Sequence, residues 1–351
     1  MSLASLLDSL PIPILQAPMA GASSSQMALD VSRAGGLGSL AAAMLSPDEI
    51  GAAVAALKAG TDAPFAVNLL VARPASPGAA ELDAALARLA PWYEAAGVPL
   101  PAAPNSFSID FTAQFEAVVR AAPPIASFAF DVVDRDQVDA LHRAGSYVVG
   151  TANTVAEARA WADVGADGIC AQGAEAGGHR GNFLAEIDAS LVGTLPLVAT
   201  IRQAVDLPVI AAGGIMDGAG VAAALQLGAS AAQLCTAFIA CPETSADEAY
   251  RAALLGPQAE HTAMTRVISG RPARGLANRF TALGEGIDPA EVPDYPRAYD
   301  AGKALNAAAR AAGDTGYGAQ WAGQGAPLAR SLPAAELMAV LAAELETALR
   351  P

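Results

Sequence analysis

The sequence has few cysteines and no basic residue at its amino terminus. Its 351 residues include three cysteines, Cys170, Cys235 and Cys241. Three cysteines are too few for a disulfide framework in a chain of this length, which favours a reducing compartment. The segment 1–10 contains no Lys or Arg and does contain Asp8, so it lacks the charge pattern of a secretory signal. We therefore expect a cytoplasmic protein.

Positive charge is also scarce. The chain has 20 Lys and Arg residues against 35 Asp and Glu residues, a formal net charge of −15 at pH 7. Because this charge repels phosphate backbones and anionic lipids, it argues against nucleic-acid and membrane partners. Any anionic ligand has to be held by local groups. With 53% hydrophobic and 16% charged residues, the composition is that of a folded protein with a large core.

Histidine is rare too, and its spacing argues against a metal site. His142 lies near the end of an expected helix, where a positive charge is favourable, so we interpret it as structural. His261 has no neighbouring nucleophile or ligand cluster. No pair of histidines or cysteines has the spacing of metal ligands, and we expect no bound metal.

The stretch 218–241 contains no charged residue and is long enough to raise the possibility of a transmembrane helix. Polar residues lie within it, and Gly228 divides it into two pieces. The first piece, VAAALQL, has a helical pattern, and the second, AAQLCTAFI, has the pattern of a buried strand. We therefore expect a helix followed by a strand.

Short apolar runs alternate with alanine-rich helical stretches along most of the chain. Two of these stretches begin with capping-box patterns, Ser46 with Glu49 and Thr154 with Glu157. Such alternation is typical of a closed TIM (β/α)8 barrel or of an open doubly wound sheet. We favour the barrel, because the runs number eight by residue 239 and no G-x-G-x-x-G follows the first. The eight runs are residues 12–19, 38–43, 65–71, 125–130, 147–152, 168–172, 208–212 and 232–239.

The pattern changes after the eighth run. Residues 241–325 contain helical stretches at 245–255 and 296–312 and no convincing buried strand. We expect this segment to form an additional smaller helical domain, a cap that binds substrate. Residues 1–240 and 326–351 would form the barrel, with an amphipathic helix over 333–349 packing back on it.

The loop after the sixth run, AQGAEAGGHRG (171–181), follows the carboxyl end of an expected barrel strand, where barrel enzymes place their active sites. Gly177 and Gly178 allow close approach of a ligand to the backbone. His179 supplies an imidazole, the side chain best suited to move protons near neutral pH. The alternative is a surface turn with an exposed histidine.

The seventh and eighth strand ends carry groups that suit a phosphate. Gly213 and Gly214 in AAGGIMDG (211–218) expose N–H groups, and Thr236 in QLCTAF (233–238) adds a hydroxyl. Loops after these two strands often bind phosphate in such barrels. The alternative is that the glycines only permit a tight turn.

Three further strand ends carry side chains that suit a planar heterocycle. Met19 follows the first strand, and its polarizable sulfur packs well against a ring, although a Met at this position also suits a core. Asn68 in the third strand and Gln172 in the sixth offer both a donor and an acceptor. Two amides around one barrel mouth favour heterocycle recognition.

The segment PDYPRAYDAGKAL places Tyr295, Tyr299 and Lys303 four residues apart. If the segment is helical from Pro296, these side chains form one stripe. Two phenols and an ammonium group suit a small anion, whereas the alternative is a solvated amphipathic face.

Taken together, these motifs resemble the class I nitronate monooxygenases, flavin enzymes formerly grouped as 2-nitropropane dioxygenases. The resemblance covers essentially the whole chain, including ILQAPMAG, FAVNLLV, AQGAEAGGHRG, AAGGIMDG, AFIACPE, YPRAYDAGK and AQWAGQ. It implies a TIM barrel that binds FMN and oxidises alkyl nitronates, such as propionate-3-nitronate, with O2 to carbonyl compounds and nitrite or nitrate. His179 would be the catalytic base or hydrogen-bond donor. The substrate would contact Tyr250, Tyr295, Tyr299 and Lys303, and the cofactor would contact Met19, Asn68, Gln172, Gly177, Gly178, Gly213, Gly214, Gln233, Cys235, Thr236 and Gln324.

The chain departs from the family pattern at two positions. Cys235 stands where relatives often have a glycine, and its side chain would shift a bound phosphate slightly. Phe107 stands where some relatives place a tyrosine. Other interpretations also stay open: an FMN-dependent NADH:quinone or enoyl-thioester reductase of the same superfamily, a non-redox phosphosugar-type barrel enzyme, and a non-catalytic flavin-binding scaffold. In the favoured case the partners are a small nitronate or nitroalkane and O2, and the protein is a monomer or homodimer.

Overall fold

The computed structural model describes residues 2–71, 87–88, 90–99, 110–288, 291–292, 295 and 297–350. Its centre is a sheet of eight parallel strands, each of which falls on one of the eight predicted apolar runs. Most residues of these strands are buried, because helices cover the outer face of the sheet and its inner face meets the barrel interior. The strands are β1 (Ile14–Gln16), β2 (Gly38–Ala41), β3 (Phe65–Leu70), β4 (Ile125–Ala129), β5 (Tyr147–Ala152), β6 (Gly168–Gln172), β8 (Val209–Ala212) and β9 (Ala231–Leu234).

The sheet closes into a barrel. Its strand order is β1-β9-β8-β6-β5-β4-β3-β2. The two end strands meet through Leu37, which accepts a hydrogen bond from Gln16 N at 2.9 Å and donates one to Ile14 O at 3.0 Å. The predicted TIM barrel is therefore confirmed, and the open doubly wound sheet is not formed.

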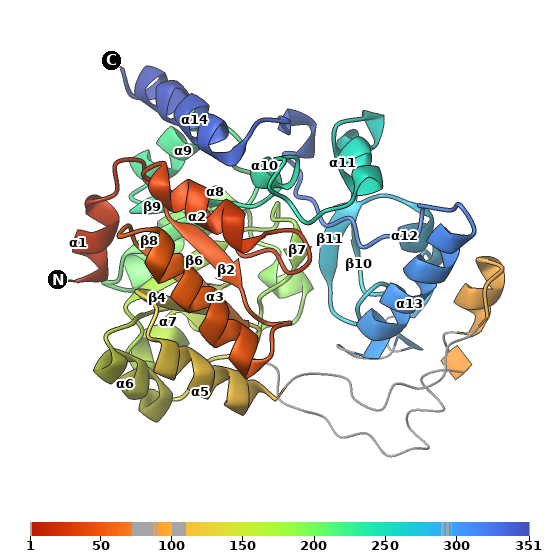
Figure 1. Cartoon of the computed structure of the whole chain (residues 1–351), viewed down its shortest axis with the longest axis horizontal. Coiled ribbons are helices and arrows are strands. Elements are labelled where there is room, and N and C mark those ends of the chain that lie inside the picture. Colours follow the sequence, from red (N-terminus) through yellow and green to blue (C-terminus); the bar gives the residue numbers. More distant parts are fainter. Residues whose placement is uncertain are drawn as a thin grey trace.

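Helices follow the strands and form the outer layer (Figure 1). The Ser46–Glu49 capping box begins α3 as predicted. His142 lies in the last turn of α6 and its Nε2 contacts Asp167 Oδ2 at 2.8 Å, in agreement with a structural role. The outer helices are α2 (Ser25–Arg33), α3 (Pro47–Gly60), α5 (Phe111–Ala121), α6 (Arg135–Ala144), α7 (Val155–Val164), α8 (Thr194–Ala204), α9 (Gly218–Gln226) and α14 (Ala334–Leu349).

The barrel has two apolar layers. One lies between the strands and the outer helices. The other fills the barrel interior with Leu15, Val149, Ile210 and similar residues. Helix α1 (Leu3–Asp8) contributes Leu3 and Leu7 to this second core, so it closes the amino-terminal end of the barrel. The opposite end is left for a site.

The uncharged stretch 218–241 forms α9 and then β9, as predicted. Among the described residues no helix is long and apolar enough to cross a membrane. The predicted strand is too long, however: the chain turns at Cys235, and α10 (Thr236–Ile239) begins where the strand was expected to continue. An apolar run that no polar residue interrupts is compatible both with a buried strand and with a buried helical turn.

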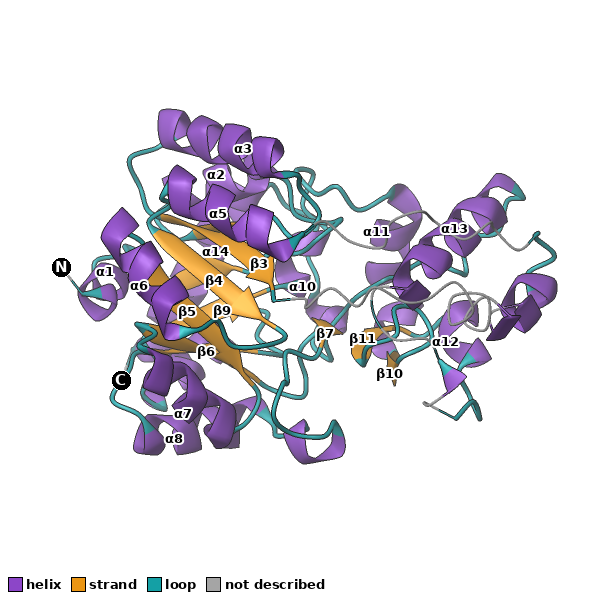
Figure 2. Ribbon diagram, turned by 90° about the horizontal axis from the view of Figure 1, so that it is seen from below, coloured by secondary structure: helices purple, strands orange, loops and turns teal. Residues whose placement is uncertain are grey.

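The segment 241–325 lies beyond the carboxyl ends of the barrel strands (Figure 2). Its described residues form three helices and two short strands, and the sequence did not indicate the strands. These strands, β10 and β11, pair antiparallel with each other, and β11 pairs with β7, which comes from the loop after β6. The elements are α11 (Glu248–Leu254), β10 (Thr262–Thr265), β11 (Ala273–Leu276), α12 (Arg279–Leu283) and α13 (Arg297–Ala311), together with β7 (Gly178–His179) and 3-10 turns at Asp188–Ser190, Pro257–Glu260 and Ala326–Leu328.

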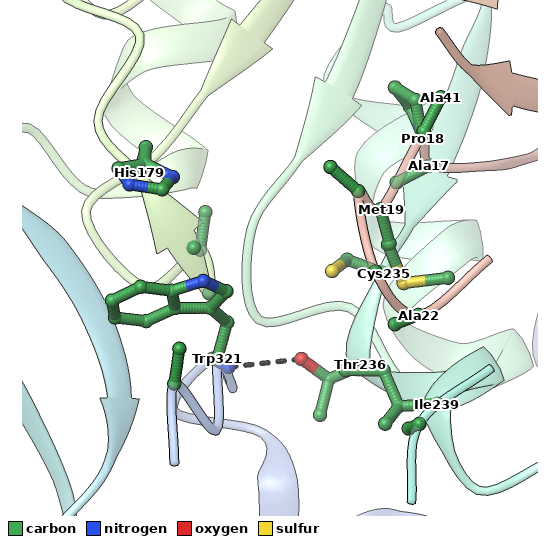
Figure 3. Close-up of a pocket in the computed structure, with 18 of the residues that line it drawn as sticks. Ala17, Pro18, Met19, Ala22, Ala41, His179, Cys235, Thr236, Ile239 and Trp321 are labelled. Carbon is green, nitrogen blue, oxygen red and sulfur yellow. Dashed lines mark hydrogen bonds between the residues drawn. The ribbon is translucent and has the colours of Figure 1, made fainter. Parts of the chain in front are cut away.

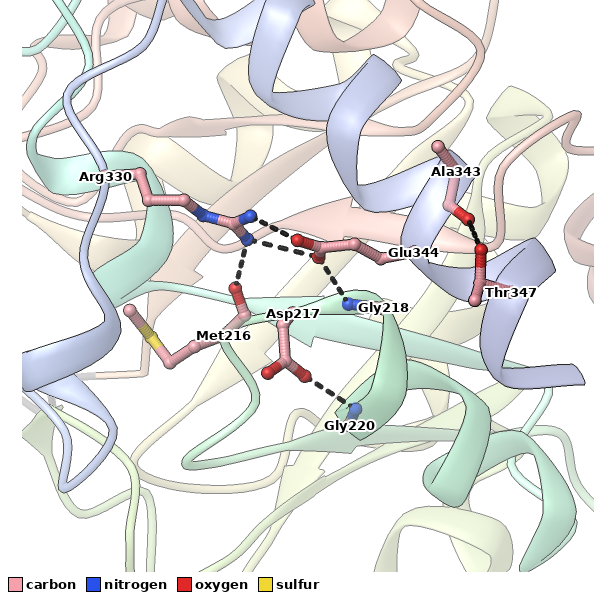
Figure 4. Close-up of polar contacts among 8 residues, drawn as sticks. All are labelled: Met216, Asp217, Gly218, Gly220, Arg330, Ala343, Glu344 and Thr347. Carbon is pink, nitrogen blue, oxygen red and sulfur yellow. Dashed lines mark hydrogen bonds and ion pairs between the residues drawn. The ribbon is translucent and has the colours of Figure 1, made fainter.

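Helix α14 packs against α2 and α9, which confirms the predicted closing helix. Figure 4 shows its main polar contact with the barrel. Glu344 on α14 accepts a hydrogen bond from Gly218 N at 3.0 Å and pairs with Arg330 at 2.6 Å, while Arg330 also donates to Met216 O at 2.9 Å. Burial raises the pKa of Glu344, but the bonds from Arg330 and Gly218 outweigh it and lower the pKa overall. The carboxyl terminus thereby fixes the loop between β8 and α9.

The packing of Trp161 on β5 gives a stability test. A Cβ at Gly150 would lie 2.0 Å from the indole of Trp161, which is fully buried. We expect Gly150→Ala to lower the free energy of unfolding by about 3 kcal/mol, because the core has no room for the methyl group. Gly51 on α3 has no atom within 4 Å of its missing Cβ, so Gly51→Ala should instead stabilise the protein by about 0.5–1 kcal/mol. Urea unfolding of both variants measures the difference; equal effects would contradict this account of the packing.

Candidate functional site

A cavity of about 330 Å³ lies at the carboxyl end of the barrel, between the strand ends and the additional segment. In Figure 3, His179 and Trp321 lie on one side of it and Met19, Cys235 and Thr236 on the other. The structure brings together nearly all predicted site residues. The lining includes Met19, Asn68, Gln172, Gly177, Gly178, His179, Gly213, Gly214, Gln233, Cys235, Thr236, Tyr250, Tyr295 and Tyr299.

His179 stands in a cage of aromatic rings. Its ring centroid lies 5.1 Å from that of Trp321, 5.6 Å from Phe130, 5.7 Å from Tyr295 and 5.8 Å from Tyr299. Its Nε2 is closed off from solvent and has no hydrogen-bond partner among the described residues. A buried polar atom of this kind calls for a ligand to satisfy it.

The cage changes the protonation of the groups inside it. Burial, and secondly the nearby Arg271, lower the pKa of His179 to about 3, so its imidazole is neutral at physiological pH. Burial likewise raises the pKa of Tyr295 to about 12 and raises the pKa of Tyr299. The cage therefore presents a neutral imidazole and two protonated phenols.

The loop that carries His179 is held by its own motif. Gln172 Nε2 donates to His179 O at 3.1 Å, and Gln172 Oε1 accepts from Gly181 N at 2.9 Å. Arg180 is fully buried and donates to Gly173 O, Gln172 O and Ser190 O. Gln172 therefore lines the cavity, but its side-chain amide forms hydrogen bonds with the loop backbone at His179 and Gly181.

A buried carboxylate supports the same loop. Thr154 caps α7, as predicted, but Glu157 does not complete the capping box. Its carboxylate instead accepts from Asn153 N at 2.7 Å, Phe183 N at 2.7 Å and Leu184 N at 3.0 Å. Glu157 therefore links β5 to the chain that follows β7.

Glycines also shape the lining of the cavity. Gly213 and Gly214 have φ angles of +125° and +71°, which L side chains rarely adopt. Their N–H groups donate to no group in the part of the chain that the structure describes. Gly178, at φ +77°, has no atom within 4 Å of its missing Cβ, so the space beside it is open. These backbone groups are available to a ligand.

The segment 319–325 crosses over this part of the cavity. Gly323 N donates to Thr236 Oγ1 at 2.9 Å, and Leu276 N donates to Gln320 O at 2.8 Å. These bonds hold Trp321 against the cage, and the hydroxyl of Tyr250 donates to Trp321 O. The hydroxyl of Thr236 therefore already has a protein partner.

Two predicted site residues lie outside the lining. Lys303 Nζ pairs with Asp300 Oδ1 at 2.7 Å and stands 4.7 Å from the ring centroid of Tyr299, on the outer side of the cage. Gln324 donates its backbone N–H to Glu175 O at 2.9 Å, between two lining glycines. Phe107 and Pro296 lie outside the described residues.

Sequence reasoning missed three residues that shape the cage: Phe130, Arg271 and Trp321. Trp321 was part of a quoted motif, AQWAGQ, but received no role. Phe130 ends an apolar run and has no polar group to mark it. Arg271 lies far from His179 in sequence and meets it only because β11 pairs with β7.

Comparisons with known proteins match nearly the whole chain. The sequence profile described as "Nitronate monooxygenase" matches residues 4–344. A nitronate monooxygenase from Paraburkholderia phytofirmans is 49% identical over 95% of this chain and 92% of its own length. One from Pseudomonas aeruginosa is 47% identical over 95% and 96%.

The chain belongs to the nitronate monooxygenase family.

Solved structures agree with this membership. A nitroalkane oxidase from Streptomyces ansochromogenes superposes with a TM-score of 0.88 at 41% identity, covering 98% of both chains. FabK from Thermotoga maritima is more distant, with a TM-score of 0.73 at 28% identity over 98% of this chain and 96% of its own.

Membership of the nitronate monooxygenase family implies a flavin cofactor, and the residues present fit one. The lining includes Gly213 and Gly214, whose N–H groups have no acceptor among the described residues, and His179, whose Nε2 has no partner there. Met19 and the amide of Asn68, which donates to Ser127 O at 3.2 Å, lie along the same cavity. Among the described residues no three His, Cys, Asp or Glu side chains gather as metal ligands.

Phe130 offers a test of strain in the cage. Its φ of +84° is unfavourable for a side chain, whereas Phe128, within the strand that ends just before it, has no positive φ. We expect Phe130→Gly to be more stable than Phe130→Ala by about 1 kcal/mol, because glycine tolerates this conformation. At Phe128 the order should reverse, with alanine the more stable by about 0.5–1 kcal/mol. Urea unfolding of the four variants decides; the same order at both positions would show that Phe130 is not strained.

Proposed function

We propose that this protein binds FMN and uses O2 to oxidise alkyl nitronates, such as propionate-3-nitronate, to carbonyl compounds and nitrite or nitrate. The observation that carries the proposal is the neutral, unpartnered imidazole of His179, enclosed by aromatic rings next to a glycine-lined cavity. The relatives named nitronate monooxygenase support it. FMN, when bound, supplies the acceptor for the electrons of the nitronate.

The glycine-lined end of the cavity suits the phosphate of this cofactor. The N–H groups of Gly213 and Gly214 have no acceptor among the described residues, and Cys235 and Thr236, at the end of the neighbouring strand, belong to the same lining. Directed N–H donors of this kind hold an anion even when the net charge of the protein is negative. The hydroxyl of Thr236 accepts from Gly323 N and, as a hydroxyl, can at the same time donate its O–H to a phosphate oxygen.

The aromatic cage suits a small nitronate or nitroalkane. Phe130 and Trp321 exclude water from the space beside His179, and the phenols of Tyr295 and Tyr299 stay protonated and able to donate to nitro oxygens. Tyr250 acts through Trp321, whose carbonyl it holds. Lys303 is screened by Asp300, so its charge acts on the substrate only from behind Tyr299.

His179 is suited to take a proton. Because its pKa is lowered to about 3, the ring nitrogen is unprotonated at neutral pH and can accept the α-proton of a neutral nitroalkane. The same low pKa makes the imidazole a weak base, so the transfer depends on the phenols of Tyr295 and Tyr299 stabilising the nitronate that forms. A preformed nitronate has already lost that proton and needs the imidazole only as a hydrogen-bond donor.

We expect His179→Asn to keep the cofactor and to lower turnover of neutral nitroethane by about 100-fold or more, with less than about a tenfold loss on ethyl nitronate. In the parent protein, turnover of nitroethane should stay level as the pH falls from about 7 to about 5, since the imidazole of His179 does not protonate in that range. Steady-state oxygen consumption measures both. Equal losses on the two substrates would show that His179 is not the base.

Anaerobic mixing separates the proposed function from a reductase. We expect the flavin of the purified protein to be reduced within one turnover by propionate-3-nitronate under argon and not by NADH. Mass spectrometry of the released cofactor should identify FMN. Rapid bleaching by NADH with no response to the nitronate would support a reductase instead, and a colourless protein that takes up no FMN would overturn the flavin assignment.

A further inference from the structure

Arg271 lies behind the aromatic cage, in the turn between β10 and β11. Its Nε donates to Arg180 O at 2.9 Å, and its Nη2 donates to Asn182 O. Because Arg180 directly follows His179, one guanidinium group fixes the backbone on the carboxyl side of the imidazole. The pairing of Ala273 with His179 fixes the strand itself.

The same guanidinium group fixes a ring of the cage. Arg271 Cζ lies 4.1 Å from the ring centroid of Phe130. Phe130 meets His179 edge to face at 5.6 Å and meets Tyr295 at 5.4 Å. A planar guanidinium is suited to stack on a ring and to donate in its own plane at the same time. This contact also helps to hold Phe130 at its positive φ.

Arg271 also acts on His179 by its charge. After burial, the positive charge of Arg271 is the second cause of the lowered pKa of His179. Its own pKa is lowered to about 10, chiefly by burial, so it remains charged at neutral pH. The other titratable or charged groups around the cage are Tyr295, Tyr299, Lys303, Asp300, Asp131, Glu157, Arg180, Arg266 and Arg274.

We infer that Arg271 is a positioning residue for His179, which holds the imidazole in the orientation that the proton transfer needs by clamping the backbone behind it and the Phe130 ring beside it. The inference rests on the proposed function in that it assigns His179 as the base. Arg271 does not line the cavity, so it acts through other residues and does not contact substrate.

Histidine NMR tests this directly, because the chain has three histidines and His179→Asn identifies the resonance of interest. The purified holoenzyme is labelled at histidine and titrated from about pH 7 to about pH 2.5, a range that includes the parent pKa of about 3. In Arg271→Met we expect the His179 resonance to move and its pKa to rise by about one unit, since a nearby cation is lost. In Arg271→Lys the resonance should still move, but the pKa should rise less, because lysine keeps the charge and lacks the planar fork.

Arg274→Met is the matched control. Arg274 lies on β11 and also donates to a carbonyl of the loop after β6, Ala174 O at 3.2 Å, but it has no ring contact with Phe130. This variant should leave the His179 resonance and its titration as in the parent. The resonances of His142 and His261 report in every variant whether the fold is intact. If Arg271→Met does not fold, Arg271→Gln takes its place, because it also lacks the charge and the guanidinium plane, and it should move the His179 resonance in the same way.

Turnover distinguishes failure of the inference from failure of the proposed function. We expect Arg271→Met to lower turnover of nitroethane about tenfold and that of ethyl nitronate less than about threefold. If the His179 resonance and titration in folded Arg271→Met match the parent, the positioning role is overturned whatever the activity. If they change as expected while the parent oxidises neither substrate, the positioning role stands and the proposed function fails.

Discussion

The site depends on one short pairing between two parts of the chain that are distant in sequence. Two residues of the loop after β6, Gly178 and His179, form the short strand β7, which pairs with β11 outside the barrel. Without this pairing the imidazole of His179 would lie on a barrel loop and would not be enclosed by aromatic side chains. With it, His179 is brought against Phe130, which directly follows β4, against Tyr299 of α13 and against Trp321.

Buried arginines hold the loops in place by donating to backbone carbonyls. Arg180, Arg271 and Arg274 each reach a carbonyl of the chain between residues 172 and 190, and burial lowers the pKa of all three. Carbonyl oxygens at loops have no ladder partner, so a guanidinium with several donors satisfies them at once. A chain with a net charge of −15 thus concentrates positive charge around its cavity.

The barrel could be predicted from sequence because its signal is local. Strands such as β6 and β8 are short apolar runs between helices with recognisable caps, and the period of the pattern carries the fold. The three-stranded sheet of β10, β11 and β7 could not be predicted from sequence, because every residue of β10 is half-buried and β7 has only two residues. Neither leaves an alternation of apolar and polar residues to detect.

The glycines and His179 could be placed because the loops after parallel strands meet at one end of a barrel. The spacing of Lys303 from Tyr299 predicted that both lie on one helix, and they do. The spacing did not determine the direction in which the ammonium group of Lys303 points. Asp300 lies three residues before it, and this spacing favours an ion pair on the helix surface. The same sequence therefore allowed two partners for Lys303, and solvent exposure decided between them.

The cage keeps its ionisable groups uncharged and its cations behind them. Burial favours the neutral forms of His179, Tyr295 and Tyr299, because each would lose more hydration than its neighbours replace. Arg271 stands beyond Phe130, and Lys303 stands beyond Tyr299. An anion in the cage would therefore meet neutral donors directly and positive charge only at a distance. Such an environment attracts an anion without pairing it tightly, which is what a site needs if the anion must react and its products must leave.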